Sequence, residues 1–431
     1  MPNNWKTYKL SELTELITKG TTPSTYGFGF TDDGINFIKS ESTNYDGRLD
    51  ESSFVKVSIE AHEKLKRSQL KENDILFSMA GAYLGKTGIV CKNHLPANTN
   101  QANGIIRINQ AKAIPKFVAL ALRNPLLVNY VNASGGQSAQ PNINLTDIGN
   151  LEIALPSIPE QKSIASILST IDDKIENNLA INKTLEEMAM ALYKHWFVDF
   201  GPFQDGEFVD SELGRIPKGW EVKIFSDLYE VKKGLSYKSK FYSDKGIPMI
   251  NLKCVDRNGG FRYDGVKYYE GEYKRQHVVL PGDLLVAMTD LTQDRTVLGS
   301  PLIAPDLNTS SDVIASLDIS ILKQIQSETS HLNLFFYYQM RTHKYHEYIL
   351  GYGNGSTVMH LDKKGLLDYT CFLPSNDVLE KFNELVSDLR NRIELNIKEN
   401  QTLTQLRDTL LPKLISGEVR LKEFREESIT N

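Results

Sequence analysis

Residues 160–197 read EQKSIASILSTIDDKIENNLAINKTLEEMAMALYKHWF and decide how the rest of the chain is organised. The stretch follows Pro156 and Pro159, and its apolar residues recur at alternating steps of three and four. That period is typical of a coiled-coil seam, because it keeps one face of a helix apolar. The predicted seam consists of Ile164, Leu168, Ile171, Ile175, Leu185 and Leu192, interrupted by Asn178 and Asn182.

The seam occurs a second time near the end of the chain, displaced by one constant offset. Its members there are Phe382, Val386, Leu389, Ile393, Asn396, Asn400, Leu403 and Leu410. Two such helices, each ending one half of the chain, predict two similar modules held apart by a pair of helices. The matched asparagines suit a buried polar layer that fixes the register of the pair. An exposed face, or a docking surface for partner helices, is the alternative.

The modules carry matching anchors as well. The matched pairs are Trp5 with Trp220, Leu13 with Leu228, and Gly20 with Gly234. Strands and helices interleave irregularly, so we expect two α+β modules in tandem repeat, each with a mostly antiparallel or mixed sheet. The opening segment predicts a short strand and then a helix capped by Ser11. Residues 115–131 predict two helices separated at Asn124-Pro125.

Composition indicates a folded intracellular protein. At 431 residues, more than one domain is expected. The three cysteines are far apart, which excludes a disulfide framework and favours a reducing, cytoplasmic setting. The N-terminus has no signal-like apolar run, and no stretch is apolar enough to span a membrane.

Charge is distributed unevenly. The net charge of −5 does not by itself indicate a nucleic-acid binder. Residues 75–146, however, contain no acidic residue but do contain Lys86, Lys92, Arg107, Lys112, Lys116 and Arg123. Such a segment is a candidate phosphate-facing surface, the alternative being an ordinary surface.

Catalytic motifs are absent or incomplete. The loop Gly81–Thr87 is one residue short of a phosphate-binding loop. His343 and His346 form a close pair without further ligands at metal spacing, and no methyltransferase motif or catalytic triad is found. We therefore expect a non-catalytic recognition protein with no metal and no bound cofactor.

Four segments in a fixed order resemble a known family. They are Pro159–Leu168, Ile171–Glu176, Ile216–Trp220 and Leu410–Glu418. With the module–helix–module–helix order, they closely resemble the DNA-specificity subunit of type I restriction–modification systems. The resemblance implies two target recognition domains that read the halves of a split sequence in double-stranded DNA. It also implies two methyltransferase subunits and restriction/translocase subunits as partners, with S-adenosylmethionine and ATP with Mg bound by those partners.

The resemblance and the repeat together give the expected domain boundaries. We expect recognition domains at 1–157 and 220–375, spacer helices at 158–200 and 376–418, a linker at 201–219 and a tail at 419–431. The helix over 160–197 would span roughly 57 Å at 1.5 Å per residue.

Loop residues beside the repeat anchors are the candidate DNA contacts, because Gln and Asn pair with adenine, Arg and Lys with guanine, and hydroxyls with bases or phosphate. In the first module they are Lys39, Ser40, Lys86, Thr87, Gln137, Gln140 and Asn142. In the second they are Lys253, Arg257, Thr289, Gln293, Arg295 and Asn354. Two alternatives stay open: a stand-alone DNA methyltransferase or nuclease with duplicated target domains, and a coiled-coil adaptor that does not bind DNA.

Overall fold

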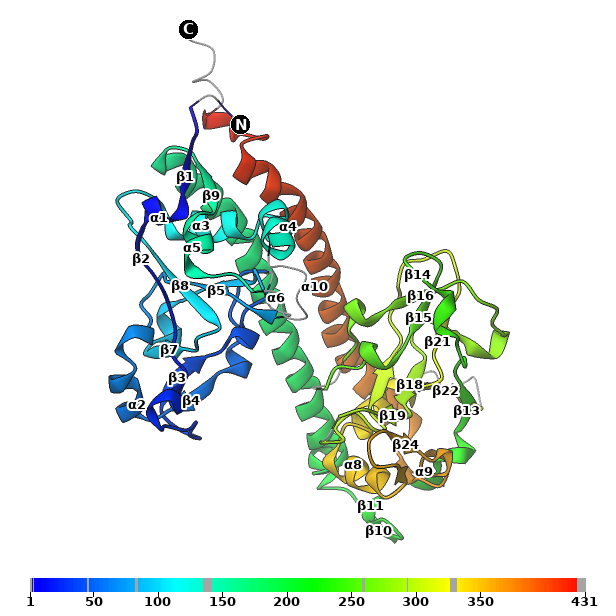
Figure 1. The fold of residues 1–431 in the computed structure, drawn as a ribbon. Helices are drawn as coiled ribbons and strands as arrows, with labels where there is room; N and C mark the ends of the chain where they lie inside the picture. Colours follow the sequence, from blue (N-terminus) through cyan, green and yellow to red (C-terminus); the bar gives the residue numbers. More distant parts are fainter. Residues whose placement is uncertain are drawn as a thin grey trace. The chain divides into compact units, whose positions relative to one another are not determined.

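A computed structural model describes residues 2, 4–44, 46–81, 84–134, 142–257, 260–292, 294–325 and 332–424 (Figure 1). Contacts divide the chain into two units. The first consists of Met1–Leu179 with Ile397–Asn431, and the second of Ala180–Asn396. Both divisions fall inside the long helices. Each unit therefore contains one module and part of both helices.

The first module is built on two small sheets. One is antiparallel, in the order β2 (Thr14–Lys19), β8 (Asn103–Ile108), β5 (Ile75–Ser78), β6 (Thr87–Ile89). The other has the order β4 (Val55–Val57), β3 (Ile35–Ile38), β7 (Ala97–Thr99), with β3 and β7 parallel. A separate pair joins β1 (Lys6–Lys9) to β9 (Glu152–Leu155). The helices are α1 (Leu10–Leu13), α2 (Ile59–Lys64), α3 (Pro115–Leu122), α4 (Pro125–Ser134) and α5 (Leu145–Gly149).

The second module repeats this topology. Its four-stranded antiparallel sheet has the order β13 (Tyr229–Lys233), β22 (Ile319–Gln324), β18 (Leu284–Ala287), β20 (Pro301–Ile303). Its second sheet has the order β14 (Tyr242–Ser243), β16 (Lys267–Tyr269), β15 (Ile247–Ile250), β21 (Val313–Ala315), β17 (Val278–Val279), again with one parallel pair, β15 and β21. β12 (Glu221–Ile224) pairs with β25 (Thr370–Leu373). The structure thus confirms the predicted tandem α+β repeat.

The second module also has elements of its own. They are the hairpin β10 (Phe208–Ser211) and β11 (Gly214–Pro217), and the sheet β19 (Thr289–Asp290), β24 (Met359–Leu361), β23 (Gly353–Asn354). Its helices are α7 (Leu332–Gln339), α8 (His343–Leu350) and α9 (Lys363–Leu367).

One local expectation is wrong. The predicted helix capped by Ser11 is only the single turn α1, capped at Lys9, and the chain continues as strand β2. The segment Thr14–Lys19 pairs along its length with β8. Ladder hydrogen bonds to a distant strand have therefore overridden the local helix signal. The predicted helix pair at 115–131 is confirmed as α3 and α4.

Two long helices, α6 (Ile158–Phe197) and α10 (Asn376–Ser416), follow the modules (green and orange to red in Figure 1). In the first unit, Asn178 hydrogen-bonds Asn400, and in the second, Asn396 hydrogen-bonds Asn182. The numbers rise along α6 as they fall along α10, so the helices pair antiparallel. Seam residues Ile164, Leu168, Ile171, Ile175, Phe382 and Val386 are buried, while Leu185, Leu389, Ile393 and Leu403 are partly buried.

Each module buries the far end of the other helix in its core. Leu411, Leu414 and Ile415 of α10 belong to the first core. Tyr193 and Phe197 of α6 belong to the second. Because such large apolar side chains contribute about 1.5–3 kcal/mol each when buried, these contacts hold both helices to both modules.

Candidate nucleic-acid interface

In the first module, the loops that carry predicted DNA contacts converge at one end of the sheets. The segment after β3 bridges to β6 through Asn44 and Thr87. The backbone of Ser78, at the end of β5, hydrogen-bonds the carbonyl of Lys86 at 2.8 Å. The adjoining Ala80 bridges to Asn142. These contacts bring together segments that are distant in sequence: the chain after β3, the ends of β5 and β6, and Asn142.

The candidate side chains of the first module differ in availability. Lys39 is partly exposed and forms a 2.8 Å ion pair with Glu41, and its ammonium lies 5.4 Å from the ring centre of Phe30. Asn142 is exposed, whereas Ser40 and Lys86 are partly buried. Thr87 is 1% exposed within β6, so its hydroxyl does not reach a surface in this conformation. Gln137 and Gln140 lie outside the described residues.

In the second module, Thr289 and Asn354 both pair with His360, from either side of β24. Asn354 is exposed, but Thr289 is buried at 6% exposure. The neighbouring Asp290 is buried and accepts backbone hydrogen bonds from Thr292, Val297 and Leu298 at 2.6, 2.7 and 2.9 Å. Asp290 therefore shapes the loop that carries Arg295, a role that its position alone did not indicate.

The basic candidates of the second module lie in exposed loops. Lys253, Arg257 and Arg295 are all exposed. Arg295 adopts φ 57°, a left-handed backbone that is uncommon for a side chain of this size. Hydrogen bonding by Thr292, and to a lesser extent the charge of Arg257, lowers the pKa of Asp294. Gln293 lies outside the described residues.

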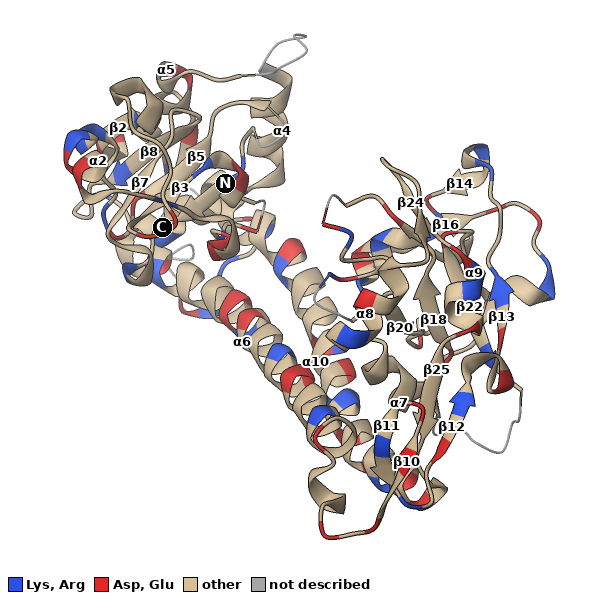
Figure 2. Ribbon diagram, turned by 90° about the horizontal axis from the view of Figure 1, so that it is seen from below, with Lys and Arg blue, Asp and Glu red and all other residues tan. Residues whose placement is uncertain are grey.

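The acid-free segment 75–146 is not one continuous phosphate-facing surface. Arg107 forms two hydrogen bonds, of 2.8 and 2.7 Å, with the buried Asp74. Arg123 pairs with Asp172 of α6, and Lys112 donates to the backbone carbonyl of Glu12. Arg107, Arg123 and Lys112 are thus engaged by partners that lie outside the segment. Along α6 and α10, acidic and basic residues are interspersed (Figure 2).

Other candidate sites find no support in the described structure. The loop that resembles a phosphate-binding loop leads into strand β6 rather than a helix, whereas phosphate loops open a helix N-terminus. His343 is exposed and contacts Glu347 at 3.3 Å. Within the described ranges, no three His, Cys, Asp or Glu side chains form a potential metal site. Nor does any helix there have the length and apolarity needed to cross a bilayer.

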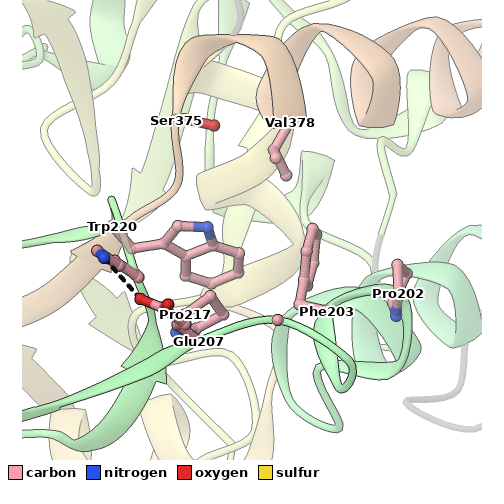
Figure 3. A pocket seen from close by; sticks show the side chains of 9 residues that line it. Pro202, Phe203, Glu207, Pro217, Trp220, Ser375 and Val378 are labelled. Atoms are coloured by element: carbon pink, nitrogen blue, oxygen red, sulfur yellow. Dashed lines mark hydrogen bonds and ion pairs between the residues drawn. The ribbon is translucent and has the colours of Figure 1, made fainter.

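The two units differ where a long helix begins beside the anchor tryptophan. In the first, buried Glu160 accepts two 2.9 Å hydrogen bonds from Arg420 and one of 3.3 Å from the indole of Trp5. In the second, the helix offset places Val378 and Pro202 at the positions of Glu160 and Arg420. An open pocket of about 550 Å³ lies there, beside Trp220 and Phe203 (Figure 3).

The duplicated module and the antiparallel helix pair define a class of two-module proteins joined by helices. Residues 2–187 match the family described as Type I restriction modification DNA specificity domain. The chain is 27% identical to the type I restriction enzyme MjaIX specificity subunit of Methanocaldococcus jannaschii, over 98% of this chain and 95% of that protein. It is 22% identical to the HindI specificity subunit of Haemophilus influenzae, over 97% and 100%.

A solved structure has the same fold. It is the S subunit of a type I restriction–modification system from M. genitalium, with a TM-score of 0.57, 16% identity, and coverage of 96% of this chain and 97% of that one. Residues 2–187 thus carry a type I restriction–modification DNA-specificity domain, and nearly the whole chain is similar to specificity subunits of such systems.

Proposed function

We propose that this chain is the DNA-specificity subunit of a type I restriction–modification complex. Each module binds one half of a split DNA target, and the helix pair sets the gap between the halves. The observation that carries the proposal is the duplication itself. Two modules with the same four-stranded sheet, sharing one antiparallel helix pair, suit a target that is read in two parts. The specificity-subunit names of full-length relatives support the same function.

The exposed loops supply suitable chemistry for base and phosphate contact. Lys253, Arg257 and Arg295 provide donors in the second module, and Lys39 and Lys86 provide them in the first. Arginine and lysine bind guanine edges and phosphates, and the amides of Asn142 and Asn354 suit adenine. The chain itself is proposed to be non-catalytic and to work in the cytoplasm. S-adenosylmethionine, ATP and Mg would be bound by its partner subunits.

The helix pair also offers two equivalent surfaces for partners. In the first unit, Ile167 of α6 and Leu406 of α10 are 38% and 46% exposed. In the second, Leu385 and Met188 occupy the corresponding repeat positions and are 50% and 51% exposed. Contiguous exposed apolar residues mark protein-binding surfaces, and the repeat places an equivalent pair of exposed apolar residues in each unit. Two matched surfaces suit two copies of one partner, which we propose to be the methyltransferase subunits, with restriction subunits joining that complex.

The recognition function is tested by sequencing methylated bases in host DNA with and without this gene. We expect one split methylated motif to disappear on deletion, and an unchanged methylome would contradict the proposal. The purified chain should methylate no DNA by itself with S-adenosylmethionine; if it does, the stand-alone methyltransferase alternative is correct.

The docking surfaces are tested by the mass of the assembled complex. Ile167→Asp and Leu385→Asp should each reduce the bound methyltransferase from two copies to one, and the two changes together should abolish binding. Leu179→Asp is the matched control, since Leu179 is 53% exposed on the same helix but its repeat counterpart Ile397 is only partly exposed. Retention of two copies by the double variant would exclude these surfaces.

A further inference from the structure

In each unit, one carboxylate of α6 contacts an arginine of the module and an arginine of α10, and so links the module to both long helices. In the first unit the carboxylate is Asp172 of α6. Its Oδ2 accepts from Arg123, which follows α3 of the module, at 3.1 Å. Its Oδ1 accepts from Arg407 of α10, also at 3.1 Å. The three side chains are 13%, 7% and 12% exposed, so the cluster is shielded from water.

The second unit also has a cluster of one carboxylate and two arginines, joined by a tyrosine hydroxyl. Glu186 of α6 accepts from Arg341, which follows α7 of the module, and from the hydroxyl of Tyr337 at 2.9 Å. Arg390 of α10 lies 4.0 Å from Glu186 and 4.9 Å from the centre of the Tyr337 ring. The three charged side chains are 15% to 18% exposed. Module, α6 and α10 again meet at one carboxylate.

The two clusters are not simple copies of one another. Arg123 and Arg341 are equivalent under the repeat offset, but the equivalent of Asp172 is Arg390. If the repeat were exact, the carboxylate of the second unit would stand at position 390 of α10. It comes instead from Glu186, so α6 supplies the carboxylate in both units. The same three-way connection is made with different residues in each half.

Such a cluster determines geometry more than stability. Apolar contacts between a module and a helix tolerate small sliding movements, because burial has no preferred direction. Charge-assisted hydrogen bonds between arginine and a carboxylate are directional, so they favour particular orientations of the groups that carry them. Burying charges also costs desolvation energy that apolar residues would not incur. A shielded cluster at each module–helix junction is thus suited to holding the module in a single pose.

We propose that Arg123–Asp172–Arg407 and Arg341–Glu186–Arg390 are positioning clusters that fix the pose of each recognition module on the helix pair. They thereby determine how strictly the complex discriminates the gap between half-sites. The inference rests on the proposed function. The clusters contribute no base contact, so their loss alters tolerance to the gap while the preferred bases of each half-site stay the same.

The test uses the full chain in complex with its methyltransferase subunits and DNA in which the native half-sites are separated by the native gap or by one or two base pairs more or fewer. The variant Arg123→Met with Asp172→Leu replaces the directional charged contact by an apolar one, and Arg407 retains Asp408 at 2.9 Å. We expect the ratio of methylation at the native gap to that at neighbouring gaps to fall about tenfold, a factor typical of losing a charged hydrogen bond. Arg341→Met with Glu186→Leu should act similarly.

The control is Lys194→Gln with Asp199→Asn, which removes an exposed 2.8 Å ion pair at the end of α6 that involves no module residue. It should leave the gap profile unchanged. Thermal unfolding and binding to single half-site duplexes establish that each variant is folded. If folded cluster variants keep the sharp gap preference, the positioning role is wrong. If the unaltered complex methylates no split motif, the proposed function fails instead.

Discussion

The side-chain amide of Asn178 donates a 2.8 Å hydrogen bond to Oδ1 of Asn400, and Asn396 donates an equal bond to Asn182. Asn178 and Asn396 are equivalent in the repeat and are 0% and 1% exposed. The matched asparagines therefore form buried polar pairs between α6 and α10, and the alternative of an exposed face does not apply to these two. Register between the helices is specified once in each unit.

Removing one member of such a pair is expected to destabilise the first unit. Asn178→Ala leaves Oδ1 of Asn400 without its donor, which costs about 1–3 kcal/mol. Asn178→Leu with Asn400→Leu removes both members, and an apolar seam should restore or raise the melting temperature. Differential scanning calorimetry measures both variants. A double variant that melts below the single one would show that the polar pair itself contributes net stability.

The ion pair between Glu160 and Arg420 is expected to hold the C-terminal segment to the first module. Arg420→Ala leaves the buried Glu160 carboxylate with the longer, 3.3 Å hydrogen bond from the Trp5 indole, at a cost of about 3–5 kcal/mol. The loss in the free energy of unfolding is measured by urea unfolding, with limited proteolysis of the first module as the readout. Lys218→Ala is the control: it breaks an exposed pair with Glu207, and exposed pairs contribute little. Equal effects of both changes would contradict this role.

The DNA contacts of each module are expected to affect binding to one half-site only. Lys86→Ala should weaken binding to the first half-site duplex only, and Arg295→Ala to the second only, so each variant is the control for the other. A lost phosphate contact lowers the salt dependence of binding by about one unit of slope, while a lost base contact costs about 1–3 kcal/mol at one position. Titration by fluorescence anisotropy at several salt concentrations distinguishes them. A variant that weakens both duplexes equally would show that its loop does not belong to one half-site.

Insertion into the spacer must respect the antiparallel pairs. Seven residues added to α6 between Asn178 and Asn182 lengthen only one helix of the pair. The hydrogen bonds of Asn178 with Asn400 and of Asn182 with Asn396 then cannot both form in one pairing of the helices. We expect this variant to melt at a lower temperature. Seven residues added also to α10, between Asn396 and Asn400, should restore the register and lengthen the gap between methylated half-sites. An unchanged gap in the methylome of the doubly extended protein would exclude the spacer role.

Cysteine reactivity provides a test of the cores. Burial raises the pKa of Cys254 to about 11 and that of Cys371 to about 12, while Cys91 is exposed. At pH 8 both buried thiols are protonated and shielded, and alkylation requires thiolate. Iodoacetamide should therefore modify Cys91 alone in the folded protein and all three cysteines after unfolding. Peptide mass spectrometry measures this, and rapid native labelling of Cys371 would contradict its placement in the core.

Much of the architecture follows from local sequence pattern. The three-and-four spacing of Ile164, Leu168, Ile171 and Ile175 identifies a long helix with one apolar face, because helix geometry alone places those residues together. Its recurrence at Phe382–Leu403 identifies the repeat. Equivalent anchors such as Trp5 and Trp220 define two modules from the sequence alone.

Partners that lie far apart in sequence could not be predicted in the same way. Arg123 and Arg107 looked like surface bases in an acid-free segment, yet their carboxylates, Asp172 and Asp74, lie outside that segment. Thr14–Lys19 carried a helix signal and became a strand only because β8 was available to pair with it. Thr87 and Thr289 looked like loop hydroxyls but are buried within paired strands.

The sequence by itself determined the repeat, the two helices, their seam and the matched asparagines, since periodicity along the chain encodes which faces are apolar. Only the tertiary structure decided which basic residues, such as Arg107 and Arg123, are held in ion pairs. It also decided that a carboxylate of α6, Asp172 in the first unit and Glu186 in the second, connects each module to both helices. Those outcomes depend on the three-dimensional proximity of charges, which spacing along the chain does not encode.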